Sequence, residues 1–261
     1  MILAFDIGNS NINLCFMQER VVLKQFRLNS DLQKTPDEYA AIIFSLMGAE
    51  KLNYGATEAV LISSVVPSIT SIIGNFVRTH LGIVPIIVNV DSDHGLNVKV
   101  DNPYELGIDR LMGALSAYTQ FKHNCIIANF GTATTFDLVS KDGDFLGGVI
   151  FPGIRLSAAA LRTGTALLPQ VDIKKPLCAV GTSTVKCIQS GLFYGFLELA
   201  DGLIDRIKNE KFADEKVELI STGGLGREIS SASRHKLNYQ PDLISLGLFV
   251  MYERVVKRKF S

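Results

Sequence analysis

The sequence has little that would direct the protein to a membrane or to nucleic acid. Lys and Arg together number 26 and Asp and Glu together number 26, so no charge excess attracts a polyanion or an anionic bilayer. The apolar stretch from Ala59 to Ile73 contains Pro67 and five hydroxyl side chains, and it is too short to cross a bilayer. The N-terminal residues reach Asp6 without a basic flank, which is not typical of a signal peptide. We expect a soluble cytoplasmic protein that binds neither nucleic acid nor membranes.

Cysteine and histidine are also scarce. The four cysteines form no C-x-x-C pair and lie in apolar or helical-looking stretches, which predicts buried free thiols rather than disulfides or a zinc site. The four histidines are scattered without metal-ligand spacing, so we assign them no metal or catalytic role. These residues are Cys15, Cys125, Cys178 and Cys187, and His80, His94, His123 and His235.

A strand–loop–strand unit occurs twice in this chain of 261 residues, which is long enough for one large or two medium domains. The first unit joins residues 1–5 to an alternating strand at residues 12–16 through the loop DIGNSN. The second joins residues 125–128 to residues 135–139 through the loop NFGTAT. A repeat at half-chain distance predicts gene duplication and an α/β fold with two similar lobes. The lobes are expected at residues 1–118 and 119–261.

Hydrophobic spacing and turn residues indicate further elements. Thr35 to Glu38 form a capping box with proline at the first helical position, which predicts a helix. The other expected elements are strands at residues 59–63 and 85–90, and helices at residues 68–81 and from Asp109 to about Phe121.

The two loops have the composition of phosphate-binding turns. Glycine lets the backbone approach a ligand, and consecutive amides in such a turn form an anion-binding nest. Small side-chain donors come from Asn9, Ser10, Thr132 and Thr134. Asp6 is suited to hold Mg²⁺ through water, because this cation binds through one or two carboxylates plus phosphates. One such loop alone is more often an ordinary hairpin, whereas a matched pair favours phosphate binding.

A third glycine-rich turn occurs at residues 217–226, which read VELISTGGLG. An apolar strand there runs into paired glycines, against which a base or ribose could lie flat. The pattern is neither a Walker loop nor a dinucleotide-binding motif. Taken alone, it is more typical of a tight turn that caps a helix than of a binding site.

In this order the three turns resemble the phosphate 1, phosphate 2 and adenosine motifs of the actin, sugar-kinase and heat-shock ATPase superfamily. More narrowly, residues 102–110 (NPYELGIDR) resemble the substrate motif of type III pantothenate kinases. Residues 147–153 (GGVIFPG) and 181–184 (GTST) add to that resemblance, which runs nearly end to end.

The resemblance implies two duplicated ribonuclease H-like lobes, with mixed sheets flanked by helices and the active site in the cleft between the lobes. It implies ATP-dependent phosphorylation of pantothenate to 4′-phosphopantothenate, the first step of coenzyme A biosynthesis, by a homodimer. The implied cofactors are ATP, Mg²⁺ and a monovalent cation, K⁺ or NH₄⁺. The implied ATP-binding residues are Asp6, Ile7, Gly8, Asn9, Ser10, Asn11, Ile12, Asn13, Thr132, Gly223 and Gly224.

The resemblance also implies roles around the substrate. Asp109 is the expected base for the pantothenate hydroxyl, and Arg110 can pair with the pantothenate carboxylate. Gly107 and Ile108 are substrate-loop positions, and Thr184 contacts pantothenate across the dimer interface. From the residues alone, Asp109 and Thr184 could instead be helix caps.

Two positions depart from the family pattern. Asn129 stands where the family usually has Asp, at a position implied to bind the monovalent cation, so this binding is expected to be weaker or altered. Val100 replaces the aromatic residue usual before the substrate motif. The alternative function is a catalytically weak or inactive homologue that acts as a regulatory or accessory factor.

Overall fold

The computed structural model describes residues 1–213 and 215–257. The chain forms two compact units. The first contains Met1–Gly95, Asp101–Ser116 and the chain from Asp242 on, and the second contains Leu96–Val100 and Ala117–Pro241. The division of the sequence into lobes at residues 118 and 119 stays a prediction. In the part of the chain described, no helix has the length and apolar character needed to cross a membrane.

The first unit is built on a five-stranded mixed sheet. Its strands are β1 (Ile2–Ile7), β2 (Asn11–Gln18), β3 (Val21–Asn29), β4 (Ala59–Ser64) and β5 (Ile86–Ile87). They lie in the order β3-β2-β1-β4-β5. The pairings of β1 with β2 and of β2 with β3 are antiparallel, and those of β1 with β4 and of β4 with β5 are parallel.

The second unit repeats this arrangement. Its strands are β6 (Asn97–Val98), β7 (Asn124–Phe130), β8 (Ala133–Val139), β9 (Asp144–Pro152), β10 (Val217–Thr222) and β11 (Asn238–Tyr239). They lie in the order β11-β10-β7-β8-β9-β6. Strand for strand, β7, β8, β9, β10 and β11 match β1, β2, β3, β4 and β5, with the same parallel and antiparallel pairings. The predicted α/β fold with two similar mixed sheets is therefore confirmed.

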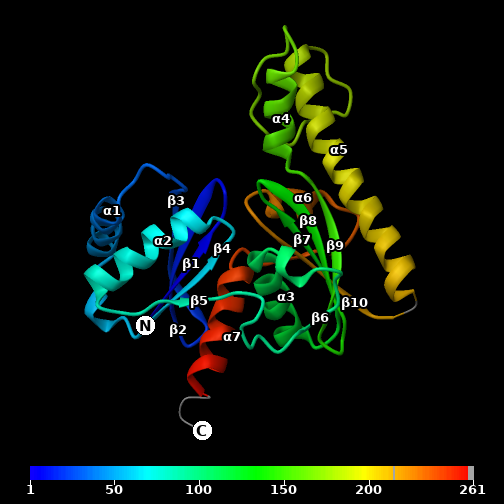
Figure 1. The fold of residues 1–261 in the computed structure, drawn as a ribbon. Helices are drawn as coiled ribbons and strands as arrows, with labels where there is room; N and C mark the ends of the chain where they lie inside the picture. Colours follow the sequence, from blue (N-terminus) through cyan, green and yellow to red (C-terminus); the bar gives the residue numbers. More distant parts are fainter. Residues whose placement is uncertain (214, 258–261) are drawn as a thin grey trace. The chain divides into compact units, whose positions relative to one another are not determined.

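Helices flank both sheets (Figure 1). They are α1 (Pro36–Ala49), α2 (Pro67–Phe76), α3 (Ile108–Phe121), α4 (Ile154–Thr163), α5 (Thr184–Ile207), α6 (Gly226–Ala232) and α7 (Leu243–Lys257). The predicted capping box is present at the start of α1, where Thr35 Oγ1 accepts the Glu38 amide and Glu38 accepts the Thr35 amide at 2.8 Å. Four strands and two helices were not expected from the sequence, namely β3, β6, β9, β11, α4 and α7.

The two faces of the first sheet carry different side chains, because neighbours in a strand alternate. Leu3, Phe5 and Ile7 of β1 enter a hydrophobic core that α1 and α2 complete. The opposite face of the sheet contacts α7, where Cys15 Sγ and Ser245 Oγ lie 2.9 Å apart in a hydrogen bond. In the second sheet the corresponding core is completed by α5 and α6.

Helix α4 and the first turns of α5 extend from the second sheet as a projection (Figure 1). We call residues 154–195 the arm. Side-chain hydrogen bonds tie its connecting segment to α5; for example, Gln189 Nε2 donates to the Asp172 carbonyl at 3.0 Å, and Tyr194 Oη donates to the Pro176 carbonyl at 3.1 Å. Large apolar side chains of the arm are nevertheless exposed, among them Leu156, Leu161, Leu167, Leu177, Val180 and Val185.

The arm also corrects the prediction about the cysteines. All four are free, but only Cys15 and Cys125 are buried, and burial raises the pKa of each to about 12. Cys178 and Cys187 are exposed on the arm. The apolar neighbours that suggested burial are themselves exposed there, so local composition misled the prediction.

Candidate active site

A row of polar side chains crosses the first sheet where β1 ends. Asp6 of β1 lies opposite Asn13 of β2 and opposite Ser63 of β4. Because paired residues on neighbouring strands point to the same face, these side chains share one face, away from the α1–α2 core. Asn13 Nδ2 donates to Asp6 Oδ2 at 3.2 Å. We call Asn13, Asp6 and Ser63 the first polar row.

Asp6 is the electrostatic centre of this row. The side chain is buried, and burial raises the pKa of Asp6 to about 7. That value already includes a smaller rise in pKa from the negative charge of Asp109 and a lowering by the hydrogen bond from Asn13. A cation close to such a buried carboxylate stabilises its ionised form.

The loop after β1 is held by the end of β3. The Gly8 amide donates to the Asn11 carbonyl at 2.9 Å and closes the turn. Ser30 Oγ donates to the Gly8 carbonyl at 2.5 Å, and the Ser30 amide donates to the Ser10 carbonyl at 3.1 Å. Because carbonyl and amide point in opposite directions across a trans peptide, the amides of Asn9 and Asn11 point away from Ser30. Asn9 and Ser10 are exposed, as a ligand-binding turn requires.

Ile7 and Ile12, which flank this loop, are fully buried in the α1–α2 core. Their side chains therefore face away from the first polar row, and only their backbone groups could serve a ligand.

Asp109 lies in the first turn of α3. The helix begins at Ile108, and Asp109 is the acidic residue of its first turn. The choice between a base and a helix cap stays a prediction. Burial raises the pKa of Asp109, while backbone hydrogen bonding and the charge of Arg110 lower it. A Cβ on Gly107 would lie 2.6 Å from Asp109 Oδ1, so glycine leaves the space that this carboxylate occupies. Ile108 is buried beside them.

The loop after β7 is packed against two other turns of the second unit. Gly223 has φ +88°, and a Cβ there would lie 2.6 Å from the Phe130 carbonyl and 2.7 Å from Asn129 Oδ1. A Cβ on Gly153 would lie 2.3 Å from the Thr132 carbonyl, to which the Gly153 amide donates at 3.0 Å. The predicted second phosphate loop and adenosine turn are therefore in direct contact through glycine. Thr132 and Gly224 are exposed at this place.

A second polar row crosses this sheet in the same register. Asn129 of β7 lies opposite Thr135 of β8 and Thr222 of β10. Thr135 Oγ1 donates to Asp137 Oδ2 at 3.0 Å, so the nearest carboxylate on β8 is two residues deeper in the sheet. We call Thr135, Asn129 and Thr222 the second polar row.

Thr184 is the first residue of α5 and is exposed on the arm. The cap of this helix is Ser183, whose Oγ accepts the Lys186 amide at 3.4 Å. The alternative of Thr184 as a cap is wrong.

The residues that face Asp6 suit a hydrated divalent cation. Within residues 1–213 and 215–257, no group of three His, Cys, Asp or Glu side chains could hold a metal ion. Mg²⁺ does not need such a cage, because it keeps several waters and binds through one or two carboxylates plus phosphates. The buried Asp6 carboxylate, with Asp109 near it, provides that donor type.

Comparisons with known proteins agree with this arrangement. A family model described as type III pantothenate kinase matches residues 2–206. The type III pantothenate kinase of Phenylobacterium zucineum (strain HLK1) is 38% identical over 97% of this chain and 98% of its own length. That of Bacillus cytotoxicus is 36% identical over 97% of this chain and 96% of its own length. The chain belongs to the type III pantothenate kinase family.

Membership of a kinase family implies ATP as the phosphoryl donor together with a divalent metal ion. The family prediction from the motifs is thereby confirmed. The matched residues contain the whole first polar row and, of the second polar row, Asn129 and Thr135.

Solved structures extend the comparison to the fold. A Campylobacter jejuni protein assigned to the Baf family of transcriptional activators has a TM-score of 0.57 at 19% identity, covering 98% of this chain and 99% of that chain. A ROK family glucokinase from Streptomyces griseus has a TM-score of 0.51 at 15% identity, covering 97% and 98%. At these identities the likeness shows the fold alone, which is the duplicated ribonuclease H-like fold of sugar kinases.

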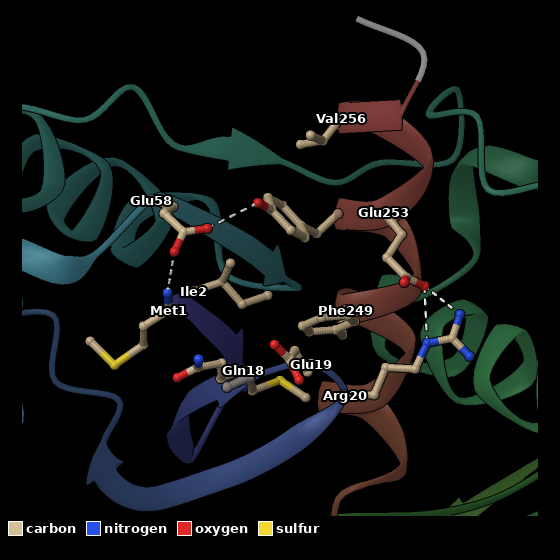
Figure 2. A pocket seen from close by; sticks show the side chains of 11 residues that line it. Met1, Ile2, Gln18, Glu19, Arg20, Glu58, Phe249, Glu253 and Val256 are labelled. Atoms are coloured by element: carbon tan, nitrogen blue, oxygen red, sulfur yellow. Dashed lines mark hydrogen bonds and ion pairs between the residues drawn. The ribbon is translucent and has the colours of Figure 1, made fainter. Parts of the chain in front are cut away.

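A separate cavity of about 480 Å³ lies at the other end of the same sheet face (Figure 2). Its lining includes Ile2 and Met17, which pair with each other at the start of β1. Figure 2 shows Glu58 joined to the Met1 amino group. Tyr252 Oη of α7 donates to Glu58 Oε2 at 3.5 Å. None of the site residues predicted from the sequence lines this cavity.

Two hydroxyls near the predicted site were missed by sequence reasoning, namely Ser30 and Ser63. A signal for Ser63 was available: β1, β4, β7 and β10 each pass from apolar residues to a polar one in their last two positions. No comparable signal marks Ser30, because its role depends on the pairing of β3 with β2.

Proposed function

We propose that this chain transfers the γ-phosphoryl group of ATP to the primary hydroxyl of pantothenate and forms 4′-phosphopantothenate, the first step of coenzyme A biosynthesis. Family membership supports the reaction. The single observation that carries the assignment of the base is the Asp109 carboxylate, which lies in the first turn of α3 and near enough to Asp6 to raise its pKa.

Asp109 acts as the general base in this proposal. The hydroxyl oxygen of pantothenate forms a bond to the γ-phosphorus while the bond from that phosphorus to the ADP oxygen breaks, and the hydroxyl proton passes to Asp109. A carboxylate with a raised pKa accepts a proton more readily at neutral pH, and burial raises the pKa of Asp109. Gly107 supports this role, because any side chain there would compete for the space of Asp109 Oδ1.

Arg110 binds the carboxylate of pantothenate in this proposal. Its guanidinium is next in sequence to the base, and a planar fork of donors suits a carboxylate. Gly107 and Ile108 form the substrate loop, and Thr184 adds a contact from the partner subunit. Pantothenate then lies with its primary hydroxyl at the Asp109 carboxylate and its own carboxylate at the Arg110 guanidinium.

ATP binds through the two glycine loops. The backbone amides of residues 8–13 and the exposed side chains of Asn9 and Ser10 receive one part of the phosphate chain. Thr132 receives another part, and the nucleoside lies against Gly223 and Gly224. When bound, Mg²⁺ neutralises phosphate charge, and Asp6 is the residue that holds it through water.

The monovalent cation site is weakened in this chain. Asn129 presents a neutral amide oxygen where an aspartate would present a negative charge, so we propose low affinity for K⁺ or NH₄⁺. The contact of Asn129 Oδ1 with Gly223 supports a position beside the adenosine turn.

The protein forms a homodimer in this proposal, with the arm as its interface. Leu167, Leu177 and Val180 of the arm are 92%, 102% and 82% exposed, whereas apolar side chains of this size are most often buried in a folded monomer. A Cβ on Gly191 or Gly195 of α5 would meet nothing within 4 Å, so this helix surface is open to a partner. Light scattering after size exclusion tests this proposal: a mass near 57 kDa supports it, and 28.5 kDa contradicts it.

The experiment that tests the function is a coupled ADP-release assay with ATP and Mg²⁺, run on pantothenate, on pantothenate lacking its primary hydroxyl, and on glucose. We expect turnover with pantothenate alone, and phosphorus NMR of the product identifies the phosphate ester. Turnover with glucose but not with pantothenate, or no turnover at millimolar pantothenate while ATP binds, contradicts the proposal.

A further inference from the structure

Ser63 carries a buried hydroxyl without a partner. Its side chain is 0% exposed, and Ser63 Oγ and Thr57 Oγ1 are the buried side-chain polar atoms of the described residues that have no hydrogen-bond partner. Burying a hydroxyl without a partner is unfavourable, so such atoms in native proteins are usually satisfied by water or a ligand. Ser63 therefore needs an explanation from its surroundings.

The surroundings of Ser63 are polar on one side only. In the sheet it lies opposite Asp6, on a strand about 4.8 Å away. On the other side, the chain after β5 brings the apolar Val88, which is buried and donates its amide to the Ile62 carbonyl at 2.9 Å. The Ser63 hydroxyl therefore lies next to the Asp6 carboxylate, which in the proposed function holds the hydrated divalent cation.

The chemistry of a hydroxyl complements that of Asp6. An ionised carboxylate only accepts hydrogen bonds, and Asn13 already donates to one of its oxygens. A water on a divalent cation is a donor, and a serine hydroxyl can accept from such a water while it donates to a carboxylate. Mg²⁺ retains several waters in protein sites, so a row of carboxylate and hydroxyl suits the hydrated ion better than a carboxylate alone.

We propose that Ser63 is a positioning residue for the hydrated divalent cation of the ATP complex. Its hydroxyl accepts a hydrogen bond from a water that the cation carries, and with Asp6 and Asn13 it fixes where that water lies. This inference rests on the proposed function, because it requires a metal–nucleotide complex at the first polar row.

The second sheet supports a hydroxyl at this position. Thr222 of β10 is the register equivalent of Ser63, since β10 pairs with β7 as β4 pairs with β1. Both sheets therefore set a hydroxyl residue beside the Asx residue at the end of the central strand. A threonine at residue 63 is thus compatible with the backbone of such a sheet.

The test measures Mn²⁺ binding rather than turnover. Electron paramagnetic resonance gives the dissociation constant of Mn²⁺ for the protein saturated with AMPPNP, a non-hydrolysable ATP analogue. We expect Ser63→Ala to raise this constant roughly three- to tenfold, the range of one hydrogen bond, while Ser63→Thr stays within about twofold of the wild type. Thr57→Val is the matched control, because it removes the other unpartnered buried hydroxyl, and it should leave the constant unchanged.

Two further readouts separate positioning from a structural role. Without metal, AMPPNP affinity should be equal in the wild type and Ser63→Ala, and the Tm of the nucleotide-free protein should not fall. An unchanged Mn²⁺ constant in Ser63→Ala overturns the inference, as does an equal loss of metal-free AMPPNP affinity. If the wild type itself binds no Mn²⁺–AMPPNP, the proposed function fails as well, and that result is distinct from a wild type that binds while Ser63→Ala is unaffected.

Discussion

The two polar rows have the same position in their sheets but differ in charge. Each lies where the central strand of a sheet enters its glycine loop, and each pairs an Asx residue with one antiparallel and one parallel neighbour. The first row contains Asp6, whose pKa is about 7, and the second contains the neutral Asn129. A duplicated backbone therefore sets the positions, and single side chains decide which copy can serve a cation.

The glycine loops differ in a related way. The first is closed by the Gly8 amide on the Asn11 carbonyl and is supported by Ser30. The second is tighter, with the Gly131 amide on the Ala133 carbonyl at 3.2 Å, and it is supported by Gly153 and Gly223. Side-chain support leaves room for substitution, whereas support by bare backbone does not.

The substitution with the largest expected effect removes the proposed base, Asp109. Asp109→Asn should lower kcat by roughly 10²- to 10⁴-fold, because the amide cannot accept the hydroxyl proton. ATP affinity, measured by calorimetry, should change little. Asp142→Asn is the matched control, since that carboxylate is exposed on the turn before β9, and it should keep wild-type activity. Full activity in Asp109→Asn would falsify its role as the base.

The substitution with the next largest expected effect replaces the charged residue of the first polar row with a neutral one, as in the second. Asp6→Asn should lower kcat/KM by roughly 10²-fold or more, since the cation loses its carboxylate partner. The same change should raise the stability of the ligand-free protein at pH 8, because it removes a buried negative charge. Steady-state assays and denaturant unfolding measure the two effects. Loss of both activity and stability would show that Asp6 is a structural residue.

The charge of the first row also predicts a pH dependence. The pKa of Asp6 is about 7 in the folded chain and near 3.8 when unfolded, so the folded state holds a proton that the unfolded state releases between these values. Stability of the ligand-free protein should therefore fall as pH rises from about 4 to 7, by up to ~1.4 kcal/mol per pH unit, and level off above that range. Asp6→Asn should flatten the profile, although Asp109 contributes with the same sign. A wild-type profile already flat over this range, measured by urea unfolding, contradicts the account.

A smaller effect tests the backbone support of the second row. Gly223→Ala should destabilise the protein by about 1–3 kcal/mol, because φ is +88° and the new Cβ would meet the Phe130 carbonyl. Gly202→Ala on α5 is the control, since a Cβ there meets nothing within 4 Å, and it should be neutral or stabilising by up to about 1 kcal/mol. Thermal unfolding distinguishes them; equal Tm values for both variants would contradict the close approach.

The substitution with the smallest expected effect introduces a negative charge into the second polar row. Asn129→Asp should strengthen activation by K⁺ several-fold, because a carboxylate attracts a cation that an amide binds weakly. A K⁺ titration of the kinase rate in a sodium-free buffer measures it. An identical K⁺ response in both proteins would remove Asn129 from the cation site.

Much of this arrangement could be predicted from the sequence, and the limits have physical reasons. The loops, the α1 capping box and α3 are encoded by local spacing, so their existence was predictable. The pairing of Asp6 with Ser63 depends on residues 57 positions apart in sequence that meet only when β1 and β4 pair. The exposure of Cys178 and Cys187 was missed because apolar composition does not distinguish a buried core from an exposed apolar surface.

The measurement that tests the central claim most directly exchanges charge between the rows. The double variant Asp6→Asn with Asn129→Asp keeps the net charge and moves the carboxylate to the second row. We predict that its kcat/KM with pantothenate, ATP and Mg²⁺ is no higher than that of Asp6→Asn alone, because the carboxylate at residue 6 is the one that lies near enough to Asp109 for their charges to interact. Recovery to near the wild-type value would show that the two rows are interchangeable and would contradict the account.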